Sequence, residues 1–376
     1  MTHPFGATFQ VPAELDDLMG GSLVASKEVY RVALLIPLCG AAGIWAPSCI
    51  SSAQVAVAEL NNGDGIRGRR VQLVMIDAAL EASQPIEDVI NELIESQLID
   101  AIVGMHISAV RQRLSKVVRQ RIPYIYTPLY EGGENTPGLF AIGETPDKQL
   151  GPAIQLIQER YEPKSWALIG NDYVWPRSSH LFAKRILRDL SARIALECYL
   201  PFGQLDMEPV ISAIKHSEAE AVLLSLVGQD AVIFNRAFGQ NGLHTKAVRL
   251  SCSIEENSLL ACGAANLERL FVVSSYFGAL KTDANLAFKE KYYGLHGEHA
   301  PVLNALGQST YEGMHYLAGL VWDYSESWRQ MNSRNNQAVS HRSGRKSNQE
   351  HRSDDTPMYL ARADGLQFYI EKDLKT

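Results

Sequence analysis

The chain has 376 residues, of which 46% are hydrophobic and 20% are charged, and its formal net charge is −7. A chain of this length is too long for a single hydrophobic core, which predicts two domains. The balanced composition excludes a disordered, collagenous or membrane-spanning chain. The negative charge excludes direct nucleic-acid binding by the body of the chain, because phosphate recognition needs a basic surface.

The cysteines and the N-terminus indicate where the chain resides. The cysteines form no CxxC pair and are odd in number, which argues against a zinc site or a disulfide framework; they are Cys39, Cys49, Cys198, Cys252 and Cys262. Scattered free thiols are typical of a reducing compartment. Residues 1–28 read as a leader with early acidic charges and interrupted apolar residues, unlike a secretory signal. The sequence therefore predicts a cytoplasmic protein.

From Tyr30 onward, strand and helix patterns alternate. The run Arg31–Pro37 is short, apolar and rich in branched residues, as buried parallel strands are. A glycine-containing loop follows, and then a helix over Pro47–Leu60 that the turn residues Asn61–Gly65 end. The next expected strands are Val71–Ile76, Ala101–Gly104 and Pro123–Tyr126, and the helices between them are Ile86–Glu95 and Ala109–Arg119.

The second half continues this alternation. The expected strands are Ser165–Gly170, Arg193–Leu200, Ala221–Leu226, Lys246–Leu250 and Leu270–Ser274. The expected helices are Thr145–Tyr161, Arg177–Leu190, Val210–His216, Ala231–Gly239, Ala284–Tyr293 and Leu303–Tyr324. Strands separated by helices of ten to fifteen residues indicate βαβ units. The strands are too many for one doubly wound sheet, so the sequence predicts an α/β fold with two.

A polar segment interrupts the alternation near the C-terminus. Residues 333–356 contain HRSGRKSNQEHRSDD and have almost no apolar side chains to bury, which predicts a flexible insertion. After it, Asp364-Gly365 lies between the apolar runs Met358–Ala363 and Gln367–Ile370 and predicts a hairpin.

Ligands of open α/β sheets bind at the carboxyl ends of the strands, so the loops that follow strands hold the candidate site residues. These loops are rich in hydroxyls and aromatics. Ser108 opens a helix, where it either caps the backbone or presents its hydroxyl to a ligand. Tyr173 and Trp175 lie two apart in the run Asn171–Arg177, either packed under the loop or forming a cleft wall. For Tyr173 and Trp175 we favour contact with the ligand over packing.

Signatures of enzymes are missing from these loops. No GxGxxG or GxxxxGK[ST] run follows a strand and opens a helix, and no GxSxG elbow is present. His106 has no evident nucleophile partner and is interpreted as a hydrogen-bonded cleft residue. Glu255 and Glu256 are interpreted as groups favoured by a helix start, with the alternative that one reaches a ligand amine. The sequence therefore predicts a binding protein without cofactor or metal, not an enzyme.

Taken together, these segments resemble the type I periplasmic-binding-protein superfamily, over about residues 30–370. The residues that carry the resemblance are VGMHIS (Val103–Ser108), YTPLYEG (Tyr126–Gly132), IGNDYVWPR (Ile169–Arg177), LVGQ (Leu226–Gln229), SYF (Ser275–Phe277) and the turn at Ala363–Phe368. The chain is most similar to the amide sensors of amidase operons and to the related receptors for urea and short amides. His106 and Trp175 stand where that branch usually has tyrosine.

The resemblance implies two lobes with a ligand cleft between them. Lobe 1 would comprise residues 29–144 and 280–325, and lobe 2 residues 148–273 and 357–376. The ligand-binding residues expected from the strand ends and the resemblance are His106, Ser108, Tyr126, Thr127, Tyr173, Trp175, Gly228, Ser253, Glu256 and Tyr276.

The function implied is a sensor for a short aliphatic amide, a urea-like compound or a similar small polar molecule. Such a sensor closes on its ligand and regulates catabolic genes through a protein partner of the antiterminator type. The alternative is the substrate-binding component of an ABC transporter for amides, urea or branched-chain amino acids, whose partner is a permease. Neither role needs membrane insertion, and a homodimer is compatible with both.

Overall fold

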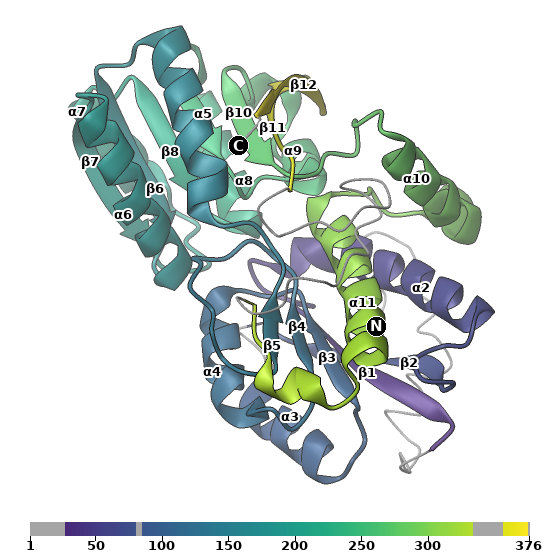
Figure 1. The fold of residues 1–376 in the computed structure, drawn as a ribbon. Coiled ribbons are helices and arrows are strands. Elements are labelled where there is room, and N and C mark those ends of the chain that lie inside the picture. Colours follow the sequence, from purple (N-terminus) through teal and green to yellow (C-terminus); the bar gives the residue numbers. More distant parts are fainter. Residues whose placement is uncertain (1–26, 80–84, 334–355, 375–376) are drawn as a thin grey trace.

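The computed structural model describes residues 27–79, 85–333 and 356–374, and these fold into two β-sheets, each accompanied by helices, one above the other in Figure 1. The predicted leader and the predicted polar insertion lie almost entirely outside the described residues. The expected α/β class with two mainly parallel sheets is confirmed. None of the five cysteines, all of which lie in the described residues, forms a disulfide.

The first sheet has five parallel strands in the order β2-β1-β3-β4-β5. They are β1 (Val29–Ile36), β2 (Arg70–Asp77), β3 (Ala101–Gly104), β4 (Tyr124–Tyr126) and β5 (Leu139–Ala141). β1 pairs with a neighbour on each side, and its residues after Val29 are all buried. A strand covered on both faces is mainly apolar, which explains the run Val32–Ile36; Arg31 precedes it and donates to the Gln72 side chain.

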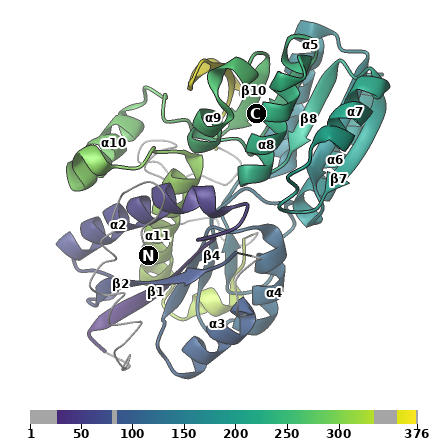
Figure 2. The ribbon, with the colours of Figure 1, turned by 180° about the vertical axis from the view of Figure 1, so that it is seen from behind.

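Helices accompany this sheet, and most of them lie on its two faces, as Figures 1 and 2 show from opposite sides. They are α2 (Ala46–Asn62), α3 (Ile86–Glu95), α4 (Ser108–Val118), α10 (Asp283–His296) and α11 (Ala305–Tyr324). The two helices from the second half, α10 and α11, return to pack on α2. The approach of α11 requires glycine at position 307, since a Cβ there would lie 2.2 Å from the Ser48 hydroxyl oxygen.

The second sheet has seven strands in the order β12-β11-β10-β9-β8-β6-β7. The parallel strands are β6 (Ser165–Asn171), β7 (Arg193–Leu200), β8 (Ala221–Ser225), β9 (Val248–Ser251) and β10 (Leu270–Ser274). The predicted hairpin is confirmed as β11 (Met358–Asp364) and β12 (Gln367–Leu374), and it adds to β10 antiparallel. Its turn lies one residue later than expected, at Gly365-Leu366, where Gly365 takes a φ of 63°.

The helices of the second sheet are α5 (Pro146–Tyr161), α6 (Val174–Asp189), α7 (Glu208–Ser217), α8 (Gly228–Gln240) and α9 (Glu256–Cys262). Helix α5 packs against α6, and α8 packs against α7 and α9. The strand β5 was not predicted, and of α9 only the start at Glu255 and Glu256 was expected, since these short segments show no clear hydrophobic period. Within the described residues, every helix is too short or too polar to span a membrane.

The chain passes between the two sheets after β5 and after β10, where hydrogen bonds join the two passages. The Ser275 hydroxyl of the second passage donates to the Glu144 carboxylate of the first, and the Tyr130 amide from the loop after β4 donates to the Glu144 carbonyl oxygen at 2.9 Å. We propose that each sheet with its helices is one lobe, with the boundaries that the resemblance implies, because every strand within each span belongs to one sheet.

Candidate functional site

Two small cavities lie between the lobes and adjoin each other. The aromatic cavity is lined by Trp45, His106, Ile107, Ser108, Tyr126, Pro128, Leu129, Tyr173, Val227, Ser253 and Leu306. The acidic cavity is lined by Pro128, Leu129, Glu144, Cys252, Ser253, Ile254, Glu255, Ser274, Ala305, Leu306 and Ser309. Four residues line both, so the cavities form one region with walls from both lobes.

The free space in this region is small. The volumes open to the centres of water-sized molecules are about 30 Å³ in the aromatic cavity and about 20 Å³ in the acidic cavity. One buried water needs roughly 10–15 Å³ by this measure. The described arrangement of the lobes therefore leaves room for a few non-hydrogen atoms only. A larger hollow bordered by α2, β2 and His296 is an open groove that includes none of the predicted site residues.

The wall from lobe 1 is a connected set of polar groups at the ends of β3 and β4. Because Gly104 pairs with Tyr126 in the sheet, the loop after β3 lies beside the Tyr126 ring. The Tyr126 hydroxyl donates to the His106 carbonyl oxygen at 2.8 Å and lies 3.3 Å from the Ser108 hydroxyl. Ser108 is the first residue of α4 and makes no capping bond, so its hydroxyl faces the cavity rather than the helix backbone.

His106 is a hydrogen-bonded residue of this wall, and its expected contact with a ligand stays a prediction. Its ring nitrogens lie 2.8 Å from the Tyr124 hydroxyl and 3.1 Å from the Ile107 carbonyl oxygen. Burial lowers the pKa of His106 to about 3, so the ring carries no charge near neutral pH.

The wall from lobe 2 is mainly apolar. Tyr173 lines the aromatic cavity from the loop between β6 and α6, with Val227 and Ser253 beside it. Trp175 lies outside the cavity wall, buried with its ring centroid 6.2 Å from that of Tyr173. The Ser253 hydroxyl donates to the Leu226 carbonyl oxygen at 2.7 Å, which fixes it at the junction of the two cavities.

Five predicted site residues lie outside the walls of both cavities: Trp175, Gly228, Thr127, Tyr276 and Glu256. The Thr127 hydroxyl donates to the Gly104 carbonyl oxygen at 3.3 Å, and the Tyr276 hydroxyl donates to the Asn285 side chain at 2.6 Å. Glu256 accepts from the Gly278 amide at 2.7 Å, and Glu255 lines the acidic cavity in its place. The two glutamates do begin a helix, but they are not the surface groups expected there: burial raises the pKa of Glu256 to about 8.

Gly228 joins the two lobes rather than lining the cavity. It lies at the start of α8 with a φ of 53°, and a Cβ built on it would stand 2.1 Å from the Ala41 carbonyl oxygen of lobe 1. The next residue, Gln229, donates its amide to that same oxygen at 2.7 Å. The structure thus shows the lobes in direct contact across the cleft.

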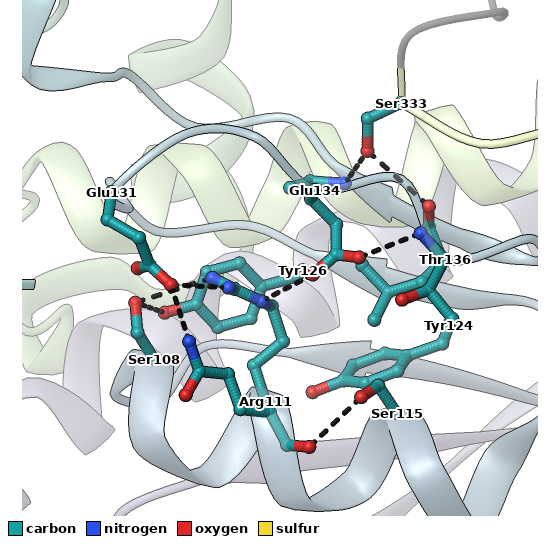
Figure 3. A network of polar contacts seen from close by, with 12 residues as sticks. Ser108, Arg111, Ser115, Tyr124, Tyr126, Glu131, Glu134, Thr136 and Ser333 are labelled. Atoms are coloured by element: carbon teal, nitrogen blue, oxygen red, sulfur yellow. Dashed lines mark hydrogen bonds and ion pairs between the residues drawn. The ribbon is translucent and has the colours of Figure 1, made fainter. Parts of the chain in front are cut away.

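Arg111 is a buried group beside the cavity that the sequence reasoning missed (Figure 3). It lies one helical turn after Ser108 and forms ion pairs with Glu131 at 2.7 Å and Glu134 at 3.0 Å. Its guanidinium carbon lies 4.9 Å from the centre of the Tyr126 ring. The i, i+3 spacing from Ser108 was the available signal, since it places both side chains on one helix face.

Other residues that line the cavities could not be identified from local sequence patterns. Trp45, Pro128 and Leu129 lie in loops that follow strands, so their segments could be singled out but not the individual side chains. Leu306 comes from α11, which enters the site from the far half of the chain. Only the return of α11 to lobe 1 brings it there.

Comparisons with known proteins agree with this architecture. The chain matches the model of a family described as "Periplasmic binding protein" over residues 29–324. A periplasmic binding protein from Burkholderia mallei superimposes with a TM-score of 0.79 at 15% identity, covering 93% of this chain and 95% of the other. A solute-binding protein of an R. palustris ABC transporter, in complex with 4-hydroxybenzoate, has a TM-score of 0.77 at 15% identity, with coverages of 92% and 96%.

A third similar structure is the substrate-binding protein of a branched-chain amino acid transporter from Streptococcus pneumoniae, in complex with isoleucine. Its TM-score is 0.73 at 14% identity, with coverages of 92% and 98%. Identities this low show a shared fold and do not transfer a ligand.

These matches overturn the predicted cytoplasmic location, which is wrong: the family is one of periplasmic binding proteins, and the similar structures include solute-binding proteins of transporters. The inference from the cysteines failed because a chain with a core this large folds without disulfides in any compartment. Unpaired thiols therefore do not distinguish the compartments. Since the family model matches most of its length, the chain belongs to the periplasmic binding protein family and is a ligand-binding protein of the type I fold.

Proposed function

We propose that this chain is the solute-binding component of an ABC transporter and captures a small, uncharged polar molecule of the short-amide or urea class. The sequence alone favoured a sensor that regulates genes through a partner. The transporter role has the better support, because similar structures include solute-binding proteins of ABC transporters. The partner would then be the permease of that transporter.

The observation that carries the proposal is the aromatic cavity, enclosed by both lobes and lined by neutral hydrogen-bonding groups. Ser108 and Tyr126 contribute hydroxyls from lobe 1, and Ser253 contributes one from lobe 2. The indole nitrogen of Trp45 is buried and has no hydrogen-bond partner among the described residues. A buried donor without a partner is costly, so a ligand carbonyl that accepts from it would stabilise the site.

The small volume limits both the size of the ligand and its affinity. Acetamide and urea each have four non-hydrogen atoms, a size that matches space for a few waters. The best small ligands gain about 1.5 kcal/mol per non-hydrogen atom, so such a ligand gains at most about 6 kcal/mol, a Kd of tens of micromolar. Titrations should therefore extend into the millimolar range.

Binding would shift the population of the two-lobed chain toward the closed arrangement. A ligand that contacts Ser108 on one lobe and Tyr173 on the other gains both contacts only when the lobes meet. Hinge motion would occur at the passages after β5 and β10, where the chain connects the lobes.

The test combines calorimetric titration with small-angle scattering of the full chain. Acetamide, propionamide and urea should bind, whereas acetone, which has the carbonyl but no NH₂ group, should bind at least about tenfold more weakly. Saturating acetamide should reduce the radius of gyration. Equal affinity for acetone, or a radius that does not change at saturation, would contradict the proposal.

A further inference from the structure

Arg111 is the cationic side chain nearest the ligand wall of lobe 1, and its nitrogens are already occupied (Figure 3). Nε donates to Glu134 at 3.0 Å, one terminal nitrogen donates to Glu131 at 2.7 Å, and the other lies 3.4 Å from the Ser108 hydroxyl. The guanidinium also lies over the rings of Tyr126 and Tyr130, at 4.9 and 5.2 Å. Two of its three nitrogens are therefore committed to carboxylates, which compensate its charge, and the third makes one long contact with Ser108.

The charge around this arginine is negative overall. One guanidinium is paired with two carboxylates, and all three side chains are at least nine-tenths buried. The neighbouring acidic cavity adds Glu144 and Glu255. Among the residues that line the two cavities there is no lysine or arginine, and the buried His106 is neutral near pH 7.

One oxygen of this cluster still lacks a donor. Oε1 of Glu131 accepts from Arg111 and from the Gln112 amide at 2.9 Å, but the buried Oε2 has no hydrogen-bond partner among the described residues. With burial and Tyr126, its charge raises the pKa of Tyr173, which lines the opposite wall. The unmet demand beside the wall of lobe 1 is therefore for a hydrogen-bond donor or a cation.

We propose that Glu131 and Glu134 determine the charge class of the ligand by occupying Arg111, so that the site accepts neutral or cationic molecules and rejects carboxylates. The inference rests on the proposed function, since it concerns the same cavity region. A carboxylate entering this region would lose its water and meet no free cation. The 4-hydroxybenzoate and isoleucine found in the similar structures both carry a carboxylate, so this chain would differ from those proteins in ligand charge.

The test uses probes of nearly identical shape and different charge. Acetamide, acetamidinium and acetate form one set, and propionamide, propionamidinium and propionate form the second. Each is titrated into the full-length wild-type protein by calorimetry at neutral pH. The amide or the amidinium of each set should bind at least about tenfold more tightly than its carboxylate.

The variant Glu131→Gln/Glu134→Gln keeps the shapes of both side chains and leaves the charge of Arg111 uncompensated. Its preference against the carboxylate should fall by about tenfold or more, because the guanidinium becomes available to an anion. The matched control is Glu326→Gln/Asp364→Asn, which removes two exposed carboxylates that also pair with arginines. The control should keep the wild-type preference. The single variant Glu131→Gln replaces the double variant if the latter does not fold.

The outcomes separate the inference from the proposed function. Wild-type affinity for acetate or propionate equal to that for the matching amide would overturn the charge selection while leaving a small-molecule site in place. An unchanged preference in the glutamine variants would overturn the role of the two glutamates. If wild-type protein binds none of the six probes, the proposed function itself fails and the inference fails with it.

Discussion

Two pairs of buried acids, one pair in each lobe, are held in opposite ways. In lobe 1, Glu131 and Glu134 share the guanidinium of Arg111. In lobe 2, Glu255 and Glu256 lie side by side without an ion pair among the described residues; Glu255 accepts from two amides, a hydroxyl and Asn304, whereas Glu256 has one amide donor. Burial accordingly raises the pKa of Glu256 to about 8.

The cavity walls show a related contrast. The wall of lobe 1 is a chain of hydrogen bonds that exists before any ligand arrives, from Tyr124 through His106 and Tyr126 to Ser108. The wall of lobe 2 offers a tyrosine, a valine and a serine. This difference indicates that lobe 1 orients the ligand through preformed polar groups, and that lobe 2 covers it on closure. Five substitutions test the two assignments.

The largest effect is expected from Gly228→Ala in lobe 2. A Cβ there would stand 2.1 Å from the Ala41 carbonyl oxygen, so the lobes cannot meet as described. We expect affinity to fall by at least about a hundredfold and the ligand-induced decrease in the radius of gyration to disappear. The control is Gly242→Ala, which has a similar positive φ of 70° but no atom within 4 Å of the added Cβ. Equal losses in both variants would mean that backbone strain, not closure, is responsible.

Ser108→Ala removes a hydroxyl of the preformed wall. We expect a loss of about 1–3 kcal/mol in binding free energy, a factor of roughly ten to a hundred, with the melting temperature of the free protein nearly unchanged. Calorimetry with acetamide and a thermal melt measure the two quantities. Intact binding with a lowered melting temperature would instead make Ser108 a structural residue.

Glu256→Gln tests the unpaired acid of lobe 2 through its pH dependence. The folded pKa of about 8 exceeds the ordinary value of 4.5, so the native state binds more protons and wild-type stability falls as pH rises between those values. Glutamine cannot ionise. The variant should therefore gain stability relative to wild type between pH 5 and pH 6.5, by on the order of 1–2 kcal/mol. Urea unfolding at both pH values measures this, with the exposed Glu268→Gln as control. If the difference in unfolding free energy between variant and wild type does not change with pH, Glu256 is not a buried, protonated acid.

Tyr173→Phe tests the wall of lobe 2, which covers the ligand on closure, rather than the preformed wall of lobe 1. The ring, which packs against Trp175 and Phe202 at centroid distances of 6.2 and 5.3 Å, remains in place. Only the hydroxyl is lost, so the expected weakening is about 1 kcal/mol or less by calorimetry. A loss larger than that of Ser108→Ala would reverse the roles assigned to the two lobes.

The smallest effect is expected from Thr127→Val. The Gly104 carbonyl oxygen that accepts from the Thr127 hydroxyl also accepts from the Thr127 amide at 2.9 Å, so it stays satisfied. We expect acetamide affinity to change by less than about twofold. A tenfold loss of acetamide affinity would show that Thr127 contributes to the site, as the sequence predicted.

The loops of the candidate site could be predicted better than the side chains within them. Ligands bind at the carboxyl ends of parallel strands, so the loops after β3, β4 and β6 could be named without coordinates. Within those loops, Ser108 and Tyr126 line the cavity, whereas Thr127, the next residue after Tyr126, faces away. Successive residues at a strand end point to opposite faces, and the face that carries the ligand depends on the other lobe.

The sequence by itself determined the α/β class, the two sheets, the hairpin and most element boundaries, because hydrophobic periods and turn residues are local properties of the chain. The tertiary structure decided everything that depends on parts meeting across the cleft. It brings Leu306 to the site, sets Gly228 against Ala41, and places Glu255 rather than Glu256 on a cavity wall. It also pairs Arg111 with two glutamates twenty or more residues away. These contacts join distant segments, and no local pattern records which distant group a buried side chain will meet.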